Sequence, residues 1–430
     1  MRVLYINAYD GLNGAGIGGY RSFKIIRDNS TLVNIKMLVK YKTTGDENVI
    51  QIPRSFQFYI KEFSKIYSYH SPLSQLHWLC KYSRMYHSTA KYNFLSNKFI
   101  DSLKPDLLNL HWLGSDLLTI ESIAKLKYPI VWKLADEWIY SGSEHYSYST
   151  DDLKTESNKS FVSRLKFFAP DALLKLSSDT YRRKITYLSE KKFHFVTPST
   201  WLSSKIRASS IFRNATLHVI PNSIDTAKWY PLDKFKSRFR LGIDPDSKVI
   251  CFGCHDFNDK RKGFDIFLET LNFLKEIVSN KNYSNIIILI FGCKKIPNHI
   301  NMPFEHVCFQ YTSDYEKVRE YYSASDLFMV TSRVDNFPNT ALEALSCKLP
   351  VFGFKTGGLS DIVKTNISGF LATPFDSYEL ASIISRYLLE TNLRRPLEES
   401  SRTYVINEFS PPKISKKYEL AYQSCLDSYH

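Results

Sequence analysis

Short apolar runs alternate with helix-like segments through the second half of this 430-residue chain, and this alternation constrains its fold more than any other feature. Four runs rich in β-branched or aromatic residues have the length of buried strands, over residues 248–253, 285–292, 326–330 and 350–354. Segments of helical period lie between them, among them residues 264–278 and 340–347. Near-continuous apolar strands separated by helices are typical of a parallel sheet covered on both faces. The pattern predicts a doubly wound α/β domain.

The first half carries the same signal less regularly, with strand candidates over residues 2–7, 32–39, 106–112, 130–134 and 193–199. A polar and aromatic insertion over about residues 151–192 is predicted to be largely helical. A chain of this length exceeds one ordinary core, and Pro, Asn and Asp cluster at the join over residues 218–233. We therefore predict Rossmann-like domains over residues 1–220 and 221–410. A terminal helix over residues 411–430 would follow two prolines and could pack back on the N-terminal domain.

Charge is distributed unevenly along the chain. The net charge is +14, and residues 1–215 hold 31 of the 57 Lys and Arg but 18 of the 43 Asp and Glu. An anionic partner, such as nucleic acid, a membrane surface or a phosphorylated substrate, would explain the excess, and so would solubility alone. No run approaches the roughly 18 apolar residues that span a bilayer, and the N-terminal run lacks the layout of a signal peptide. We expect a cytoplasmic protein.

The seven cysteines are irregularly spaced and do not form a disulfide framework. Cys251 and Cys254 make a single C-x-x-C, with no second pair or His pair near it. We interpret them as small buried residues at the end of a strand rather than as a zinc or redox site.

The segment DNFPNTALEALSCKLPVFGFKTGG, residues 335–358, places two carboxylates across a turn and the start of a helix. Asn336 or Asn339 is predicted to cap that helix, whose free N–H groups and positive dipole end suit a pyrophosphate. Asp335 precedes the helix and Glu343 lies about one turn inside it, so the two acids could bind hydroxyls on either side of the phosphates. This layout fits a sugar–diphosphate–ribose ligand. Two unrelated carboxylates on a loop and a helix face are the alternative.

Two further segments follow strand candidates. In DFNDKRKGFDIF, residues 256–267, Arg261 and Lys262 are placed to engage phosphate oxygens. In GLNGAGIGGYRSF, residues 11–23, the glycines lack the G-x-G-x-x-G spacing. Gly18 and Gly19 are predicted to form a loop against a phosphate or sugar, and a plain flexible turn is the alternative.

Taken together, these motifs resemble glycosyltransferase family 4, whose members are retaining, nucleotide-sugar-dependent enzymes with the GT-B fold. The resemblance rests on Arg261-Lys262-Gly263, on Asp335-x7-Glu343 and on the glycine-rich segment, and it is densest over residues 218–371. The stretch WKLADEWIYSGSEHY, residues 132–146, is similar to a segment of the branch that includes builders of bacterial surface polysaccharides.

The resemblance implies two Rossmann-like domains facing across a cleft. It implies donor-binding roles for Gly18, Gly19, Arg261, Lys262, Asn339, Thr340 and Glu343, and catalytic roles for Asp136 and Asp335. Arg261 and Lys262 would neutralise the diphosphate, Glu343 would hold the ribose, and Asp335 would touch the transferring sugar. No metal and no cofactor would be needed beyond a UDP- or GDP-sugar donor, and the acceptor would be a glycan or a lipid-linked glycan.

Two departures from the family pattern stand out. Asp335 replaces the usual Glu, and Ala135 stands where a His usually precedes Asp136. Asp136 and His111 are then the nearest polar candidates on the acceptor side, although an ordinary strand-end histidine is the favoured interpretation of His111. His145 matches the family pattern and could equally be structural.

Ala135 therefore keeps open a second hypothesis, a catalytically impaired nucleotide-sugar-binding scaffold in a polysaccharide assembly complex. The spacing of Asp335 and Glu343 disfavours an inverting, epimerase-like enzyme. For the basic first half, an anionic membrane surface at the inner face of the cell membrane is preferred over nucleic acid, because no nucleic-acid-binding motif is present.

Overall fold

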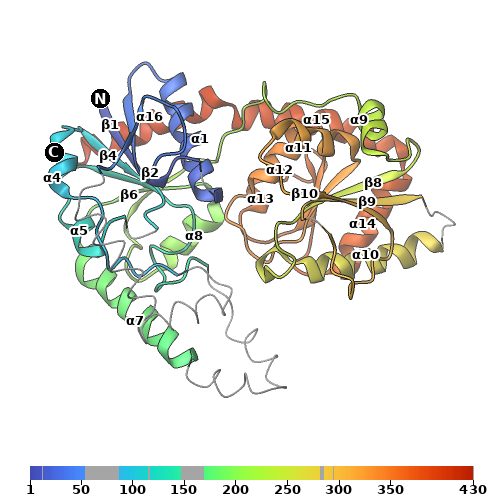
Figure 1. Ribbon diagram of the computed structural model, residues 1–430, viewed down its shortest axis with the longest axis horizontal. Helices are drawn as coiled ribbons and strands as arrows, with labels where there is room; N and C mark the ends of the chain where they lie inside the picture. The colour runs from blue at the N-terminus through green and yellow to red at the C-terminus, as the bar shows by residue number, and fades with distance from the viewer. Residues whose placement is uncertain are drawn as a thin grey trace. The chain divides into compact units, whose positions relative to one another are not determined.

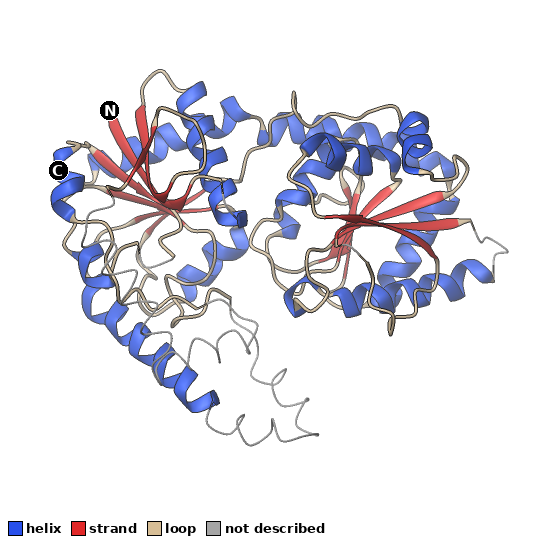
Figure 2. Cartoon of the chain, viewed as in Figure 1, coloured by secondary structure: helices blue, strands red, loops and turns tan. Residues whose placement is uncertain are grey.

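The computed structural model describes residues 1–11, 13–53, 87–114, 117–146, 169–280, 285–293 and 295–429. The chain forms two compact units, one made of Met1–Ile220 with Ile414–His430 and the other of Pro221–Lys413. Within each unit a parallel β-sheet lies between layers of helices (Figure 1, Figure 2). The predicted pair of doubly wound α/β domains is confirmed. The cleft predicted between them stays a prediction.

The described part of the first unit has a seven-stranded sheet in the order β3-β2-β1-β4-β5-β6-β7. Its strands are β1 (Arg2–Tyr9), β2 (Asn34–Tyr41), β3 (Val49–Gln51), β4 (Leu107–Leu110), β5 (Ile130–Lys133), β6 (His194–Thr197) and β7 (Thr216–Val219). Its helices are α1 (Asn13–Asn29), α4 (Asn97–Ser102), α5 (Ile120–Ala124), α7 (Ala169–Leu188), α8 (Thr200–Ala208) and the C-terminal α16 (Pro411–Asp427).

The core of this unit has two layers because successive strand residues point to opposite faces of the sheet. Leu4 and Ile6 of β1 pack in the layer that contains α4, α5 and α8. Val3 and Tyr5 pack in the layer that contains α1 and α16. The C-terminal helix thus covers the sheet of the first unit, where the hydroxyl of Tyr422 donates to Asn109 Oδ1 at 2.8 Å.

All five strands predicted in the first half are present, but β3 and β7 were missed. Both lie at sheet edges, and β7 has no buried residue, so neither produces an apolar run. The described end of the predicted helical insertion is α7, and residues 151–168 lie outside the described residues.

The loop predicted at Gly18 and Gly19 is wrong, because both residues lie inside helix α1. Glycine has low helix propensity, and the loop was predicted on that basis. The packing of the helix against the sheet outweighs this propensity. A Cβ atom on Gly19 would lie 2.3 Å from Asn7 Nδ2, so the missing side chain lets α1 approach β1 closely. The predicted contact of these glycines with a donor stays a prediction.

The described part of the second unit has a six-stranded sheet in the order β10-β9-β8-β11-β12-β13. Its strands are β8 (Lys248–Gly253), β9 (Ile286–Gly292), β10 (Glu305–Gln310), β11 (Leu327–Val330), β12 (Val351–Phe354) and β13 (Gly369–Ala372). Its helices are α9 (Lys234–Leu241), the 3-10 turn η2 (Lys260–Lys262), α10 (Phe264–Ser279), α11 (Tyr315–Ala324), α12 (Asn339–Ser346), α13 (Leu359–Ile362), α14 (Ser377–Leu389) and α15 (Thr391–Phe409).

The four strands predicted here are β8, β9, β11 and β12, and the two predicted helices are α10 and α12. Ile250 and Phe252 of β8 pack toward α10 and α14, while Val249 and Cys251 pack toward α11, α12 and α15. Cys251 and Cys254 are buried and free, as interpreted from the sequence. No helix among the described residues is both long and apolar enough to cross a bilayer.

Both sheets reverse their order of growth between two central strands. In each sheet, the unit's first strand lies near the centre, with its second and third strands in turn toward one edge. The later strands follow in sequence order toward the other edge. In doubly wound sheets, ligands bind at the carboxyl ends of the strands that flank such a reversal. The reversals lie between β1 and β4 in the first unit and between β8 and β11 in the second. Functional side chains are therefore expected in the loops that follow these strands.

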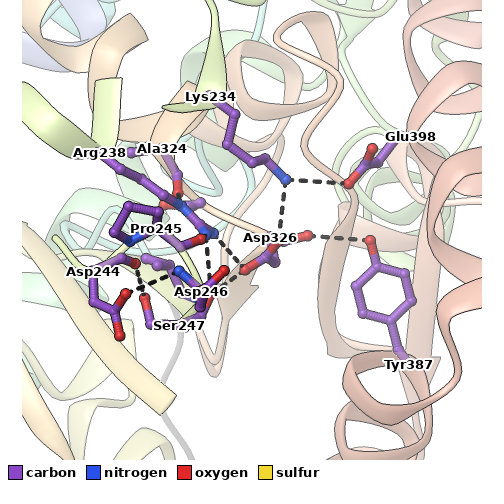
Figure 3. A network of polar contacts seen from close by, with 12 residues as sticks. Lys234, Arg238, Asp244, Pro245, Asp246, Ser247, Ala324, Asp326, Tyr387 and Glu398 are labelled. Atoms are coloured by element: carbon purple, nitrogen blue, oxygen red, sulfur yellow. Dashed lines mark hydrogen bonds and ion pairs between the residues drawn. The ribbon is translucent and has the colours of Figure 1, made fainter. Parts of the chain in front are cut away.

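A buried ion-pair network ties α9 to the sheet of the second unit (Figure 3). The side chain of Asp326, next to β11, is 5% exposed and accepts from Arg238 at 2.9 Å, from Lys234 at 3.1 Å and from the Val249 N–H at 2.7 Å. Arg238 also donates to the carbonyl of Ala324 at 2.9 Å. Burial raises the pKa of Asp326, but Lys234 and Arg238 outweigh it and hold that pKa below its usual value.

We predict that Asp326→Asn lowers the free energy of unfolding by about 3 kcal/mol, because it leaves the charge of Arg238 buried without its partner. Since the pKa of Asp326 is lowered in the fold, its contribution is present above the unfolded value of about 4 and is lost as the pH falls through the folded pKa. Urea unfolding at neutral and acidic pH measures both effects.

The matched control is Glu399→Gln, which removes an exposed partner of Lys348. It should change the unfolding midpoint little, because exposed ion pairs contribute weakly. Equal losses in the two variants, or a loss for Asp326→Asn that is independent of pH, would contradict this account of the network.

Candidate active site

Two loops of the second unit meet beside the strands that flank the sheet reversal. The turn η2 follows β8, and the Asp259 carboxylate caps it by accepting from the Arg261 N–H at 3.0 Å. Gly263 comes next, with φ of +64°, and α10 begins after it. The Thr331 hydroxyl, just after β11, donates to the Gly263 carbonyl at 2.8 Å. A Cβ on Gly263 would lie 2.1 Å from the Thr331 carbonyl oxygen, so only glycine fits this contact without a shift of the backbone.

Arg261 and Lys262, predicted to bind the diphosphate, lie here together with Asp335, the acid predicted to touch the transferring sugar. Asp335 Oδ2 lies 2.9 Å from Lys262 Nζ and 3.3 Å from an Arg261 guanidinium nitrogen. Arg261 also contacts Asp259 at 3.1 Å. Burial raises the pKa of Asp335, but Lys262 and Arg261 more than offset this and keep the pKa of the carboxyl below its usual value. Asp335 is thus an ionised, internal counter-ion of the two cations.

The double glycine that ends the 335–358 segment supports the backbone of Asp335. Gly357 has φ of +53°, and a Cβ there would lie 2.2 Å from the Asp335 carbonyl oxygen. The Gly358 N–H donates to the same oxygen at 2.9 Å. The loop after β12 therefore packs directly against the loop after β11, which requires the absence of a side chain.

The predicted asparagine cap of α12 is wrong. Pro338 occupies the N-cap position, and no side chain caps the helix. Asn339 is instead the first helical residue, and its side-chain oxygen accepts from Asn222 at 3.1 Å. Proline sets a backbone angle that suits a helix start but offers no side-chain acceptor. The first amides of α12, at Asn339 and Thr340, therefore keep the anion-binding potential of a helix end without a competing side-chain cap.

Glu343 lies one helical turn after Asn339 and therefore on the same side of α12. It is 7% exposed, and the Tyr322 hydroxyl lies 3.4 Å from its Oε2. Sequence inspection missed Tyr322 because it lies 21 residues earlier, on α11. Buried carboxylates need hydrogen-bond donors, and a ligand diol next to Glu343 could supply further ones.

In the first unit, a cavity lies at the carboxyl ends of β4 and β5. Its lining includes Ala135 and the three candidates from the sequence, His111, Asp136 and His145. The remaining lining is rich in tryptophan, with Trp112, Trp132 and Trp138. The cavity volume is about 20 Å³, which is room for about one water molecule. A sugar cannot enter it as it stands, so an acceptor would lie at its mouth.

Asp136 and His145 are in direct contact in this cavity. His145 Nδ1 lies 2.5 Å from Asp136 Oδ2, and His145 Nε2 lies 2.9 Å from the Ser88 hydroxyl. The other oxygen of Asp136 accepts from the Trp138 N–H at 3.0 Å. Ser88 was missed, because nothing in the sequence marks a serine 57 residues away from the histidine it contacts. These contacts hold the Asp136 carboxylate in one orientation.

His111 follows β4 and is buried, with 5% exposure. Its Nδ1 has no hydrogen-bond partner among the described residues. Burial, together with the charge of Lys133, lowers the pKa of His111 well below its usual value, so the imidazole is neutral at physiological pH. His111 therefore lines this cavity as an uncharged imidazole.

No group of three or more His, Cys, Asp or Glu side chains that could hold a metal ion occurs in the part of the chain that the structure describes.

We predict that Gly263→Ala destabilises the second unit more than Gly242→Ala does. Both glycines have positive φ, +64° and +67°, but a Cβ on Gly242 meets nothing within 4 Å. Gly242→Ala should cost about 1–2 kcal/mol from the left-handed backbone alone. Gly263→Ala adds a backbone clash and should also weaken anion binding by the adjacent Lys262. Urea unfolding separates the two variants, and equal losses would show that the contact with Thr331 is unimportant.

Residues 233–404 match the family model of the glycosyl transferases group 1. A curated relative, the N-acetyl-alpha-D-glucosaminyl L-malate synthase of Bacillus anthracis, is 23% identical over 219 residues, which are 50% of this chain and 55% of the relative. The chain spans about half the length of this and similar curated relatives that it matches.

Solved structures resemble the whole chain. The sucrose-phosphate synthase of Thermosynechococcus elongatus has a TM-score of 0.63 at 14% identity, over 99% of both chains. The Anabaena protein HepE, solved in complex with UDP-glucose, has a TM-score of 0.60 at 16% identity, over 99% of this chain and 100% of that one. The glycosyltransferase resemblance seen in the motifs is confirmed at this level, while membership of family 4 stays a prediction. The chain has the GT-B fold, and its residues 233–404 are similar to the glycosyl transferases group 1.

Proposed function

We propose that the chain is a retaining, metal-independent glycosyltransferase that moves a sugar from a UDP- or GDP-sugar to a glycan or lipid-linked glycan acceptor. The pathway that we propose for it is bacterial surface polysaccharide biosynthesis. The observation that carries the proposal is the cluster of Lys262, Arg261 and Asp335 at the ends of β8 and β11, within the residues that match the family. The complex of the Anabaena relative with UDP-glucose supports a nucleotide-sugar donor.

Donor binding would exchange one anion for another. Without a donor, Lys262 and Arg261 contact the carboxylate of Asp335. A diphosphate carries more charge than one carboxylate and would take over both cations, with Arg261 able to contact two phosphate oxygens. Asp335 would then be released to accept hydrogen bonds from hydroxyls of the transferring sugar. The same ion pairs hold the cations in place before the donor arrives.

Charge develops on the leaving diphosphate as the sugar–phosphate bond breaks. Lys262, Arg261 and the first amides of α12 would stabilise that charge without rearrangement, which is the most effective form of electrostatic catalysis. No metal and no further cofactor is part of this proposal. Glu343, buried beside Tyr322, would accept from the ribose hydroxyls and set the position of the nucleotide along the helix.

On the acceptor side, we assign Asp136 to the acceptor hydroxyl. His145 and the Trp138 N–H already hold the carboxylate, so it would orient the hydroxyl without losing side-chain entropy at that step. The departing phosphate would take the proton, in keeping with retention. His111 is neutral and lines the same cavity. We assign it a supporting contact with the acceptor, in place of the histidine that the family has where this chain has Ala135.

The scaffold hypothesis has one specific observation in its favour. Ala135 lines the cavity, and its side chain has no polar atom at the position where the family that this chain resembles has histidine. Against it, Arg261, Lys262 and Asp335 lie together as the proposed donor site requires. Donor hydrolysis and transfer with a panel of UDP- and GDP-sugars, with and without lipid-linked acceptors, separate the two. Nucleotide binding without any turnover would favour the scaffold.

Three single changes test the donor site. Lys262→Ala should weaken binding of the nucleotide sugar about tenfold or more, because it removes a charge-assisted contact. Glu343→Gln should also weaken it. Asp335→Asn should bind the nucleoside diphosphate at least as tightly as the native chain, because the internal counter-ion is gone, yet transfer should fall. Isothermal titration with UDP and GDP, alongside turnover, measures both properties.

Lys317→Ala is the control for these changes, since Lys317 is exposed on α11. It should leave binding and turnover unchanged. If Asp335→Asn weakened diphosphate binding as much as Lys262→Ala did, the exchange of anions would be refuted.

A separate change tests the acceptor side. Asp136→Asn should leave the affinity for the nucleotide diphosphate unchanged and reduce transfer at least about a hundredfold, as expected when a positioned catalytic group is lost. His145→Gln should reduce transfer less, because it removes only the residue that holds Asp136. Native-like transfer by Asp136→Asn would remove this residue from the mechanism.

A further inference from the structure

Arg333 lies in the loop after β11 and holds the turn η2 by two hydrogen bonds. Its backbone N–H donates to the carbonyl of Arg261 at 2.8 Å. Its guanidinium Nη1 donates to the carbonyl of Lys260, also at 2.8 Å. One residue thus fixes two neighbouring carbonyls of the turn that carries both cations of the candidate site.

The next two carbonyls of this stretch are held from the same loop. The Thr331 hydroxyl donates to the carbonyl of Gly263 at 2.8 Å and lies 3.3 Å from the carbonyl oxygen of Lys262. Four consecutive carbonyls, those of residues 260–263, therefore each accept a hydrogen bond from Thr331 or Arg333. With these carbonyls held, the turn has little freedom to move against the end of β11.

The Asp265 carboxylate fixes the guanidinium of Arg333 in turn. Nη1 lies 2.8 Å from Oδ1 and Nη2 lies 2.6 Å from Oδ2, a two-point contact that sets the orientation of the guanidinium. The hydrogen bonds from Arg333 hold the pKa of the Asp265 carboxyl below its usual value, so both partners are charged at neutral pH. Asp265 stands in the first turn of α10, so the pair joins the segments on both sides of η2.

The loop after β11 thus contacts the turn in two different ways. Arg333 holds the backbone of the turn, while Asp335 contacts the side chains of Lys262 and Arg261. The Asp265 side chain is 66% exposed, so its pair with Arg333 lies outside the apolar core of the second unit. The clearest effect of this pair is on where the turn places its two cations.

We propose that Arg333 is a positioning residue of the donor site, which holds η2 so that Lys262 and Arg261 meet the diphosphate of the nucleotide sugar without rearrangement. Groups that are held in place before a ligand arrives lose less entropy on binding and stabilise developing charge more effectively. The inference rests on the proposed function and adds a residue that acts on the donor through the turn rather than by contact.

Isothermal titration of the full chain with UDP tests this role. Arg333→Gln should weaken UDP binding about tenfold in the native chain but at most about threefold in the Lys262→Ala background, because residues that act through one another are not additive. Arg333→Lys should lose as much affinity as Arg333→Gln. Lysine keeps the charge but lacks the planar fork that contacts a carbonyl and two carboxylate oxygens together.

Asp265→Asn separates positioning from a simple effect of charge. The change removes a negative charge close to the turn, which by electrostatics alone would strengthen the binding of an anion. If Arg333 positions the turn, Asp265→Asn should instead weaken UDP binding by about threefold or more. Urea unfolding should give Arg333→Gln and Asp265→Asn midpoints close to that of the native chain.

Arg240→Gln is the matched control, because it breaks another ion pair of the second unit, in which Arg240 is 62% exposed and contacts Glu320 at 3.0 Å. It should leave UDP binding unchanged.

Four outcomes would overturn the inference. Arg333→Gln could bind UDP like the native chain, or Arg333→Lys could restore the native affinity. The loss from Arg333→Gln could be equally large in the Lys262→Ala background, which would make Arg333 a direct ligand of the diphosphate. Losses that accompany lower unfolding midpoints in both the Arg333 and the Asp265 variants would make the role a structural one. A native chain that binds neither UDP nor GDP would overturn the proposed function as well, so the two failures are distinguishable.

Discussion

The contact of Asp335 with Lys262 and Arg261 is the interaction on which the candidate site depends. It joins the loop after β8 to the loop after β11, where the sheet of the second unit reverses its order. Glycines without room for a Cβ hold the loops at this distance, Gly263 against Thr331 and Gly357 against Asp335. In the proposed function, an anionic ligand would bind Lys262 and Arg261, which are already in place, and would displace the Asp335 carboxylate from them.

The central strands could be predicted from the sequence because each is an apolar run, covered by helices on both faces of the sheet. The helices between them could be predicted from their helical period. The edge strands β3, β7 and β10 could not, since a strand paired on one side needs few apolar residues. The edge strand β13 is apolar but only four residues long. The glycines of α1 misled the prediction in another way: a residue that weakens a helix locally was retained because Gly19 lets that helix approach Asn7. Tertiary packing decided both outcomes.

For the candidate site, the sequence pointed to some of the residues that lie together and missed others. Arg261, Lys262 and Asp335 belong to short motifs and were selected from these motifs. The structure brings their side chains together. Their long-range partners, Tyr322 and Ser88, carried no local signal. The predicted asparagine cap was wrong because Pro338 occupies the N-cap position. The sequence also gave no reason to expect that Asp335 would face the cations as a counter-ion, since that depends on how two loops meet.

The central claim is that a diphosphate replaces Asp335 as the partner of Lys262 and Arg261. The most direct measurement is a carbon-13 NMR titration of the Asp335 carboxyl with and without bound UDP, with Asp335→Asn to assign the signal. The account predicts that its pKa, held low by the two cations, rises when the diphosphate takes them over. A pKa that stays the same or falls further on UDP binding would contradict it.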